Sequence, residues 1–289
     1  MLTKIDVDSE NAFFLPILGV TPKDSLLIRQ VTGLNSADIN LFIGDYARDG
    51  GIYQGRRVGN RNIVLTIDLN PNPALGETVS GLRELLYKAF LDPQVDADYI
   101  KLAFHDDTGN VRYLVGYTEK IETDIFSPET TVQISIICPD PYLRDEVETT
   151  LENTPGWITV PPFTYQGTAD TGFEVEIVIN TATPTLTLSN NSVTDTTTDP
   201  LYNQGRMIIT RDFVVGDSVY INTNRGSRDI ILTPSGGGDP ISLIGGLSPL
   251  SPWLELHSQS NVMKVAGATP TSVVAAITSL KYRPAYWGI

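Results

Sequence analysis

A strand-like run that stops at a doubled proline corner constrains this chain most. In Thr131–Cys138, valine and isoleucine alternate with threonine, glutamine and serine, which is the period of a half-buried β-strand. Pro139 and Pro141 follow and remove two backbone donors, so no strand ladder continues through them. The pattern predicts a strand over residues 131–137 that ends at this corner, almost at the midpoint of the 289 residues.

Length and composition bound the class of protein. With 289 residues, 41% of them hydrophobic, the chain can bury sizeable cores in one or two domains. No run of about 18 apolar residues occurs, so we expect no membrane span, and the first residues lack the pattern of a secretory signal. Cys138 is the one cysteine. It excludes an intrachain disulfide, fits folding in a reducing cytosol and is expected to be buried.

The charge of the chain is strongly negative and uneven. The net charge is −14, and residues 1–150 hold 13 Lys/Arg against 23 Asp/Glu. An acidic surface argues against binding of nucleic-acid phosphates, which requires a basic footprint. It is compatible with DNA that passes nearby without specific binding, because a negative wall repels a polyanion. Ordinary solubility is the alternative explanation of the same charge.

The first half reads as strands with one helix. Between about residues 77 and 91 the apolar period changes to 3.6, and the apolar stripe consists of Leu82, Leu85, Leu86, Ala89 and Phe90. Thr78 or Gly76 can cap this helix, and Asp92-Pro93 ends it. Residues 99–104 and 111–117 flank an Asp/Thr/Gly turn and predict a hairpin. A helix among about six strands predicts an α+β sandwich with the helix on one side.

The second half is threonine-rich and carries no helical period. Short apolar runs at roughly ten-residue spacing predict an all-β sandwich or jelly roll. Proline and glycine breakers between residues 145 and 170 suggest a boundary. We therefore expect a first domain over 1–150, a linker over 151–164 and a second domain over 165–289, whose last strand is a candidate to return toward the first.

Three motifs together carry a family resemblance. The proline corner ending in Tyr142-Leu143 is preceded by Gly55-Arg-Arg-Val-Gly-Asn-Arg61, which runs into the alternating segment Ile63–Leu69. In this order they resemble the distal tail protein family of long-tailed (siphovirus-type) bacteriophages. In the second half, residues 216–232 look like a paired-strand element of the galectin-like modules found in tail proteins, as do the closing residues 280–289.

The resemblance implies a structural virion protein at the tail tip, assembled in the host cytoplasm. Residues 1–150 would form the ring-forming belt domain, a β-sandwich with one helix and a projecting hairpin. Residues 165–289 would form a galectin-like sandwich. The implied assembly is a hexameric ring that joins the tail tube protein to the tail hub or tail-associated protein. Its channel would admit the tape measure protein and DNA.

Residues suited to catalysis or metal binding are scarce. The sequence has two histidines, His105 and His257, so a structural zinc site lacks ligands. No Gly-x-Ser-x-Gly elbow occurs. Glu174 and Glu176 on one strand face fit a solvated surface, and Asp106-Asp107 fits a turn. We predict no catalytic, cofactor-binding or metal-binding residues and no enzyme activity.

The one basic concentration in the acidic first half consists of Arg48, Arg56, Arg57 and Arg61. These arginines are candidates for a ring interface, because head-to-tail contacts of one patch with another generate rings. Arginine binds interface carboxylates with a planar fork. Alternatively, they are surface charges that protect a strand edge from aggregation.

Three other functions remain open at this point. A carbohydrate-binding module that contacts the host cell surface would rest on exposed aromatic rings, with Tyr202 and Trp253 as the candidate glycan contacts. Another tail-tube or hub subunit would share the β-sandwich architecture. A tail-tip glycosidase or esterase would need a pair of carboxyl groups across a cleft, which the sequence does not reveal.

Overall fold

The computed structural model describes residues 2–9, 13–19, 24–45, 51–91, 99–123, 130–190, 205–258, 260–267 and 273–288. The chain divides into two compact units. Unit 1 comprises Met1–Glu146 and Tyr286–Ile289, and unit 2 comprises Val147–Ala285. The last residues of the chain therefore belong to the same unit as its first half. Strands dominate both units, as the sequence predicted, and the mainly β fold class is confirmed.

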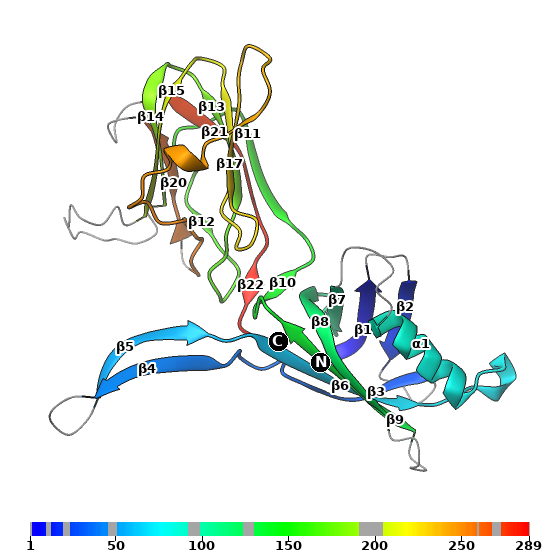
Figure 1. Ribbon diagram of the computed structural model, residues 1–289. Helices are drawn as coiled ribbons and strands as arrows, with labels where there is room; N and C mark the ends of the chain where they lie inside the picture. The colour runs from blue at the N-terminus through cyan, green and yellow to red at the C-terminus, as the bar shows by residue number, and fades with distance from the viewer. Residues whose placement is uncertain are drawn as a thin grey trace. The chain divides into compact units, whose positions relative to one another are not determined.

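The strands of unit 1 form one sheet whose two ends pair with each other. In spatial order β1, β2, β3, β6, β9, β8 and β7 each pair with the next, and β7 pairs with β1 (Figure 1). All these pairings are antiparallel except that of β2 with β3. The bounds are β1 Leu2–Ser9, β2 Phe13–Gly19, β3 Leu26–Thr32, β6 Arg61–Leu69, β7 Ile100–Asp106, β8 Val111–Thr123, β9 Thr131–Cys138, β10 Leu143–Asp145 and β22 Ala285–Tyr286.

The closure of this sheet adds a feature that the sequence did not predict for the α+β first half. Strand β8 is 13 residues long. Its beginning pairs with β7, from Val111 opposite His105, and its end pairs with β9, up to Thr123 opposite Val132. A register irregularity between Thr118 and Lys120 lies within the second pairing. Because one long strand serves two neighbours, the sheet closes on itself and needs no second layer of strands.

The helix α1 (Val79–Leu91) covers the core of unit 1 and was predicted from its apolar stripe. Thr78 caps it, since its Oγ1 accepts a hydrogen bond from the backbone N–H of Gly81 at 3.1 Å. Four helix residues are buried, namely Leu82, Leu86, Ala89 and Phe90. They pack with the inward side chains of the sheet, including Ile63, Leu65, Ile67, Ile134 and Ile136. A short 3-10 helix, η1 (Pro73–Leu75), precedes α1.

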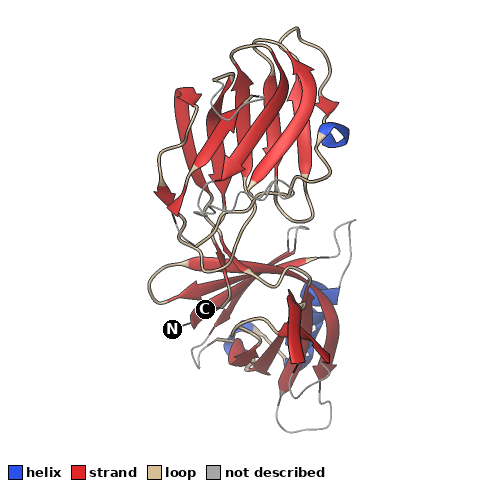
Figure 2. Ribbon diagram, turned by 90° about the vertical axis from the view of Figure 1, so that its left-hand side faces the viewer, coloured by secondary structure: helices blue, strands red, loops and turns tan. Residues whose placement is uncertain are grey.

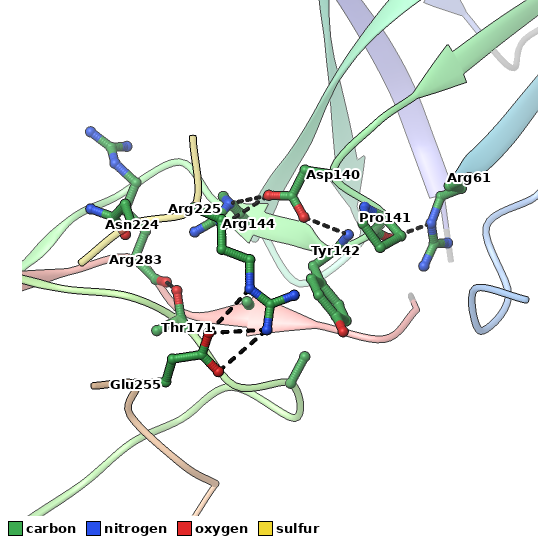
Figure 3. Close-up of polar contacts among 12 residues, drawn as sticks. Arg61, Asp140, Pro141, Tyr142, Arg144, Thr171, Asn224, Arg225, Glu255 and Arg283 are labelled. Carbon is green, nitrogen blue, oxygen red and sulfur yellow. Dashed lines mark hydrogen bonds and ion pairs between the residues drawn. The ribbon is translucent and has the colours of Figure 1, made fainter. Parts of the chain in front are cut away.

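The predicted strand and its proline corner are both present. Strand β9 ends at Cys138, directly before Pro139. The corner is held by Asp140, whose Oδ2 accepts hydrogen bonds from Arg144 at 3.0 and 2.8 Å and whose Oδ1 accepts one from the Tyr142 backbone (Figure 3). Leu143 then enters β10 and is buried. Residues just beyond the corner are therefore part of the core of unit 1.

Two further strands of unit 1 lie outside this sheet. Strands β4 (Ile39–Asp45) and β5 (Gly51–Val58) pair only with each other and make a long hairpin (Figure 1). At its base the backbone N–H of Gly59 donates to the carbonyl of Asp38 at 2.9 Å.

Unit 2 is a β-sandwich (Figure 2). Its larger sheet has the order β11 (Thr149–Trp157), β21 (Ala275–Tyr282), β13 (Glu174–Ile179), β16 (Ser218–Asn222), β17 (Asp229–Thr233) and β18 (Ile241–Ser242). The facing sheet consists of β15 (Arg206–Phe213), β14 (Thr183–Asn190) and β20 (Met263–Ala266), and a short pair joins β12 (Phe163–Thr164) to β19 (Ser260–Asn261). The 3-10 turn η2 spans Ile244–Gly246. The core between the sheets includes Phe173, Ile177, Leu186, Ile209 and Ile277.

The segment expected as a linker, residues 151–164, belongs largely to this sandwich. Strand β11 begins at Thr149 and pairs with β21, and its register shifts between Glu152 and Trp157. Gly156 lies at this irregularity with a φ of 116°, a value that favours glycine. The proline and glycine of this stretch thus mark a bulge within a paired strand. Among the residues that the structure describes, no helix is long and apolar enough to cross a membrane.

Candidate functional site

The hairpin of β4 and β5 is the most exposed apolar element in unit 1. Its register pairs Ile39 with Val58 and Ile43 with Tyr53. An irregularity lies between Phe42 and Ile43, and Gly55, the partner of Phe42, has a φ of 149°. A glycine at such a φ is typical of a β-bulge, which bends and twists the strand that carries it.

One face of this hairpin carries five apolar side chains. Residues that alternate along a strand, or lie directly opposite across a pair, share a face. By that rule five residues form what we call the hairpin face, namely Ile39, Leu41, Ile43, Tyr53 and Val58. Leu41, Ile43 and Tyr53 are 58%, 63% and 60% exposed. A row of large apolar side chains in water is the usual mark of an interaction surface.

Arginines accompany the hairpin face. Arg56 lies opposite Leu41 and so on the same face, and Arg57 lies opposite Asn40 on the other face. Both arginines are exposed. Strands β4 and β5 contain one acidic residue, Asp45, besides the two arginines, so together they carry a net charge of +1 in a strongly acidic chain. Arg48, the third predicted interface residue, lies outside the described residues.

Arg61 differs from the other arginines because it is buried, at 3% exposure. Its guanidinium donates to four backbone carbonyls, those of Pro141 at 2.6 Å, Gly33 at 2.8 Å, Asn35 at 2.7 Å and Trp287 at 2.5 Å. Figure 3 shows the first of these bonds. Burial lowers the pKa of Arg61, while the nearby Cys138 and Asp140 oppose that shift. The guanidinium of Arg61 thus forms its hydrogen bonds inside unit 1. Arg56 and Arg57 are the described residues that we retain as interface candidates.

The aromatic candidates for glycan contact have different positions. Tyr202 lies outside the described residues. Trp253 is partly buried and packs against the core of the sandwich. The guanidinium of Arg228 lies 5.4 Å from the centre of its ring, a cation–π distance. One face of this ring is thus already in contact with another side chain.

The histidines and carboxylates have local partners. His105 Nε2 lies 2.6 Å from Asp6 Oδ2, and His257 Nδ1 lies 3.1 Å from Asp170 Oδ1. Asp106 accepts from the backbone of Thr108 and of Asn110, as expected of a turn aspartate. Across the described ranges, no three His, Cys, Asp or Glu side chains are grouped so as to hold a metal ion.

The family resemblance implied a projecting hairpin in this domain, but the sequence pattern did not locate its strands. The sequence reading grouped the arginines but assigned no strands to residues 39–58. The sequence does contain a pattern that favours a hairpin here. Strand-forming residues lie on either side of Gly50-Gly51, in Ile-Asn-Leu-Phe-Ile at 39–43 and in Ile52-Tyr53. These runs are not regularly alternating, since the bulge interrupts the period of β5.

Comparison with solved structures shows a fold match over almost the whole chain. The crystal structure of the Dit protein of phage SPP1, described as a paradigm of the hub adsorption apparatus in phages that infect Gram-positive bacteria, matches with a TM-score of 0.63 and 15% identity. The match covers 97% of this chain and 98% of that chain. The fold expected from the resemblance to distal tail proteins is thereby confirmed.

Other matches are weaker in geometry. A chain of the phage P2 baseplate, in its activated conformation with Ca, gives a TM-score of 0.48 at 11% identity, covering 98% of both chains. A cap protein of the anti-feeding prophage tube gives a TM-score of 0.25 at 17% identity, covering 46% of this chain and 83% of that one. No protein-family profile and no curated protein matches the sequence.

Proposed function

We propose that this protein is the distal tail hub of a long-tailed bacteriophage, a structural component whose copies close into a ring. The ring connects the tail tube protein to the hub or tail-associated protein of the adsorption apparatus. It leaves a channel for the tape measure protein and for DNA, which passes without specific binding. By family resemblance the ring is a hexamer, with the galectin-like second unit as an additional module of each copy.

The observation that carries the proposal is the hairpin face. Leu41, Ile43 and Tyr53 are all more than half exposed, and covering each of them on association would contribute about 1 kcal/mol. A two-stranded hairpin is marginally stable in water unless it packs against something else. A neighbouring copy would supply that packing and remove the apolar surface from solvent.

Charge favours a second copy as the occupant. Strands β4 and β5 carry Arg56 and Arg57 against one acidic residue, Asp45, and so have a net charge of +1, whereas the chain as a whole has a net charge of −14. A basic arm and an acidic body attract each other between copies, and such complementarity guides association and register. The contact joins two different surfaces, so it is head-to-tail and generates a ring when the rotation closes.

The hairpin face can be tested with a double variant, Leu41→Asp with Ile43→Asp. We expect the wild-type protein to sediment as a ring in analytical ultracentrifugation and to appear as rings in negative-stain images. The double variant should sediment as a protomer with an unchanged circular dichroism spectrum. The matched control is Val215→Asp with Val273→Asp in unit 2, which places the same two charges at other exposed apolar residues and should leave rings intact.

Three outcomes would contradict the proposal in whole or in part. A wild-type protein that stays a protomer at every concentration tested would exclude a self-assembling ring. Polymerisation into long stacks would instead identify a tail-tube subunit, since a distal ring stops at one or two layers. Equal assembly of the double variant and the wild type would remove the hairpin face from the interface.

A further inference from the structure

We propose that Tyr286–Gly288 is a clasp that fixes the base of the hairpin, and that ring assembly depends on this segment. This inference rests on the proposed function, because it concerns the same hairpin. It adds a regulatory role for residues that lie far from the hairpin in sequence. The clasp belongs to unit 1.

Both aromatic residues of the clasp are held by side chains of unit 1. Tyr286 Oη donates to Asp145 Oδ2 at 2.8 Å, and the guanidinium of Arg112 lies 3.9 Å from the centre of its ring. Trp287 meets the ring of Tyr142 edge-on, with 5.1 Å between ring centres. Edge-on pairs of this kind contribute beyond the area that they bury. The clasp is therefore docked at the strand end that follows the proline corner.

Arg61 connects this docked segment to the approach of the hairpin. Its guanidinium binds the carbonyl of Trp287 together with those of Gly33 and Asn35. Strand β4 begins at Ile39, so these two carbonyls belong to the segment that leads directly into the hairpin. A buried guanidinium keeps its charge and must be surrounded by acceptors. Removing the clasp would leave it with one acceptor fewer.

Gly288 adds a second contact with the same segment. A Cβ at Gly288 would lie 3.0 Å from the carbonyl oxygen of Leu34 and 3.3 Å from the carbonyl carbon of Asn35. The two backbones thus lie against each other with little room for a side chain. Gly33 is equally confined, since a Cβ there would meet the Asn62 carbonyl oxygen. The hairpin approach is held between β6 on one side and the clasp on the other.

Because a chain is synthesised from its N-terminus, the clasp is made after the hairpin and after unit 2. Val147–Ala285, the whole of unit 2, lies between the proline corner and the clasp. The hairpin approach therefore gains its contacts with the clasp only after unit 2 has been made. A nascent or truncated chain would present a hairpin with a loosely held base, and such a hairpin binds a neighbour less well because ordering it costs free energy.

The experiment uses the full chain with Trp287→Ala, and separately with Gly288→Val, which disturb different contacts of the clasp. Each is first placed in the Leu41→Asp/Ile43→Asp background, where protomers stay apart. Hydrogen exchange of amides in residues 33–45 should become about tenfold faster in both, while unit 2 exchanges as before. In the otherwise wild-type chain, each substitution should lower the fraction of protein sedimenting as rings. Arg225→Ala, which breaks an ion pair with Glu255 in unit 2, is the control and should change neither measurement.

The outcomes separate this inference from the proposed function. Unchanged exchange of residues 33–45 in both variants would overturn the clasp, whether or not rings form. Faster exchange with normal ring formation would overturn the dependence of assembly on it. Failure of the wild-type chain to form rings would remove the proposed function, and with it the assembly role of the clasp.

Discussion

Gly116 on β8 packs against Cys138 on β9 with no room for a side chain, since a Cβ at Gly116 would lie 2.8 Å from the Cys138 sulphur and 2.7 Å from Ile136. This contact lies where β8 passes from one partner strand to the other. We expect Gly116→Ala to destabilise unit 1 by about 1–3 kcal/mol, because the core must move to accept the added methyl group.

Chemical denaturation of the purified protein measures this effect. The matched control is Gly59→Ala, where a Cβ would lie 3.5 Å from its nearest neighbour, Asn40 Nδ2, and which should change the stability of unit 1 by less than about 0.5 kcal/mol. Equal midpoints for Gly116→Ala and the wild type would show that the contact between β8 and β9 is loose.

The thiol of Cys138 should not react with alkylating reagents in the folded protein. It is fully buried, and burial raises the pKa of its thiol to about 12. Since the thiolate is the reactive form, we expect no labelling by iodoacetamide at neutral pH and complete labelling after denaturation. Rapid labelling of native protein would mean that the corner after β9 opens readily.

The pair of His257 and Asp170 should make the stability of unit 2 depend on pH. The hydrogen bond with Asp170 raises the pKa of His257 above its usual value, with burial opposing. A raised pKa means that the pair stabilises the fold fully below the unfolded pKa, about 6.5, and loses this contribution as the pH rises through the folded value. Because both side chains are partly exposed, the contribution should be roughly 0.2–1 kcal/mol.

A double-mutant cycle with His257→Gln and Asp170→Asn tests this pair. The coupling free energy should be present in mildly acidic buffer and absent well above the folded pKa of the histidine. A coupling that does not change with pH would show that the histidine is not charged in the pair.

Reversing the charge of the hairpin should weaken assembly. Arg56→Glu and Arg57→Glu should each reduce ring formation without altering the fold of the protomer, because the arm would then repel an acidic neighbour. Analytical ultracentrifugation is the measurement, and Lys88→Glu on the exposed face of α1 is the control for the change in charge. Unchanged oligomers in both arginine variants would exclude these residues from the interface.

Local pattern predicted the elements with the most regular hydrophobic period, although β1, which buries Ile5 and Val7, was not predicted. The strand Thr131–Cys138 and the helix ending at Leu91 were predicted because burial of one face imposes a period of 2 or 3.6 on the residues. The hairpin of β4 and β5 escaped because it has no core of its own and a bulge interrupts its period. The supposed linker was misassigned because the breakers Pro155 and Gly156 lie at a bulge inside β11.

The positions of the candidate interface arginines likewise could be predicted only in part from the sequence. Sequence grouped Arg56, Arg57 and Arg61 as one basic patch, but strand alternation separates the first two onto opposite faces and Arg61 is buried. No local pattern distinguishes them, because the four carbonyls that bind Arg61 come from three separate parts of the chain.

The sequence by itself determined that this is a mainly β protein with one helix before the proline corner, because hydrophobic periodicity and proline act through neighbouring residues. Only the tertiary structure decided that the sheet of unit 1 closes and that residues 286–288 pack against it. It also decided that Arg61 is buried and binds four backbone carbonyls. These features depend on pairings between residues more than a hundred positions apart in places. Their free energies arise from packing and hydrogen bonds that form only when the distant segments meet.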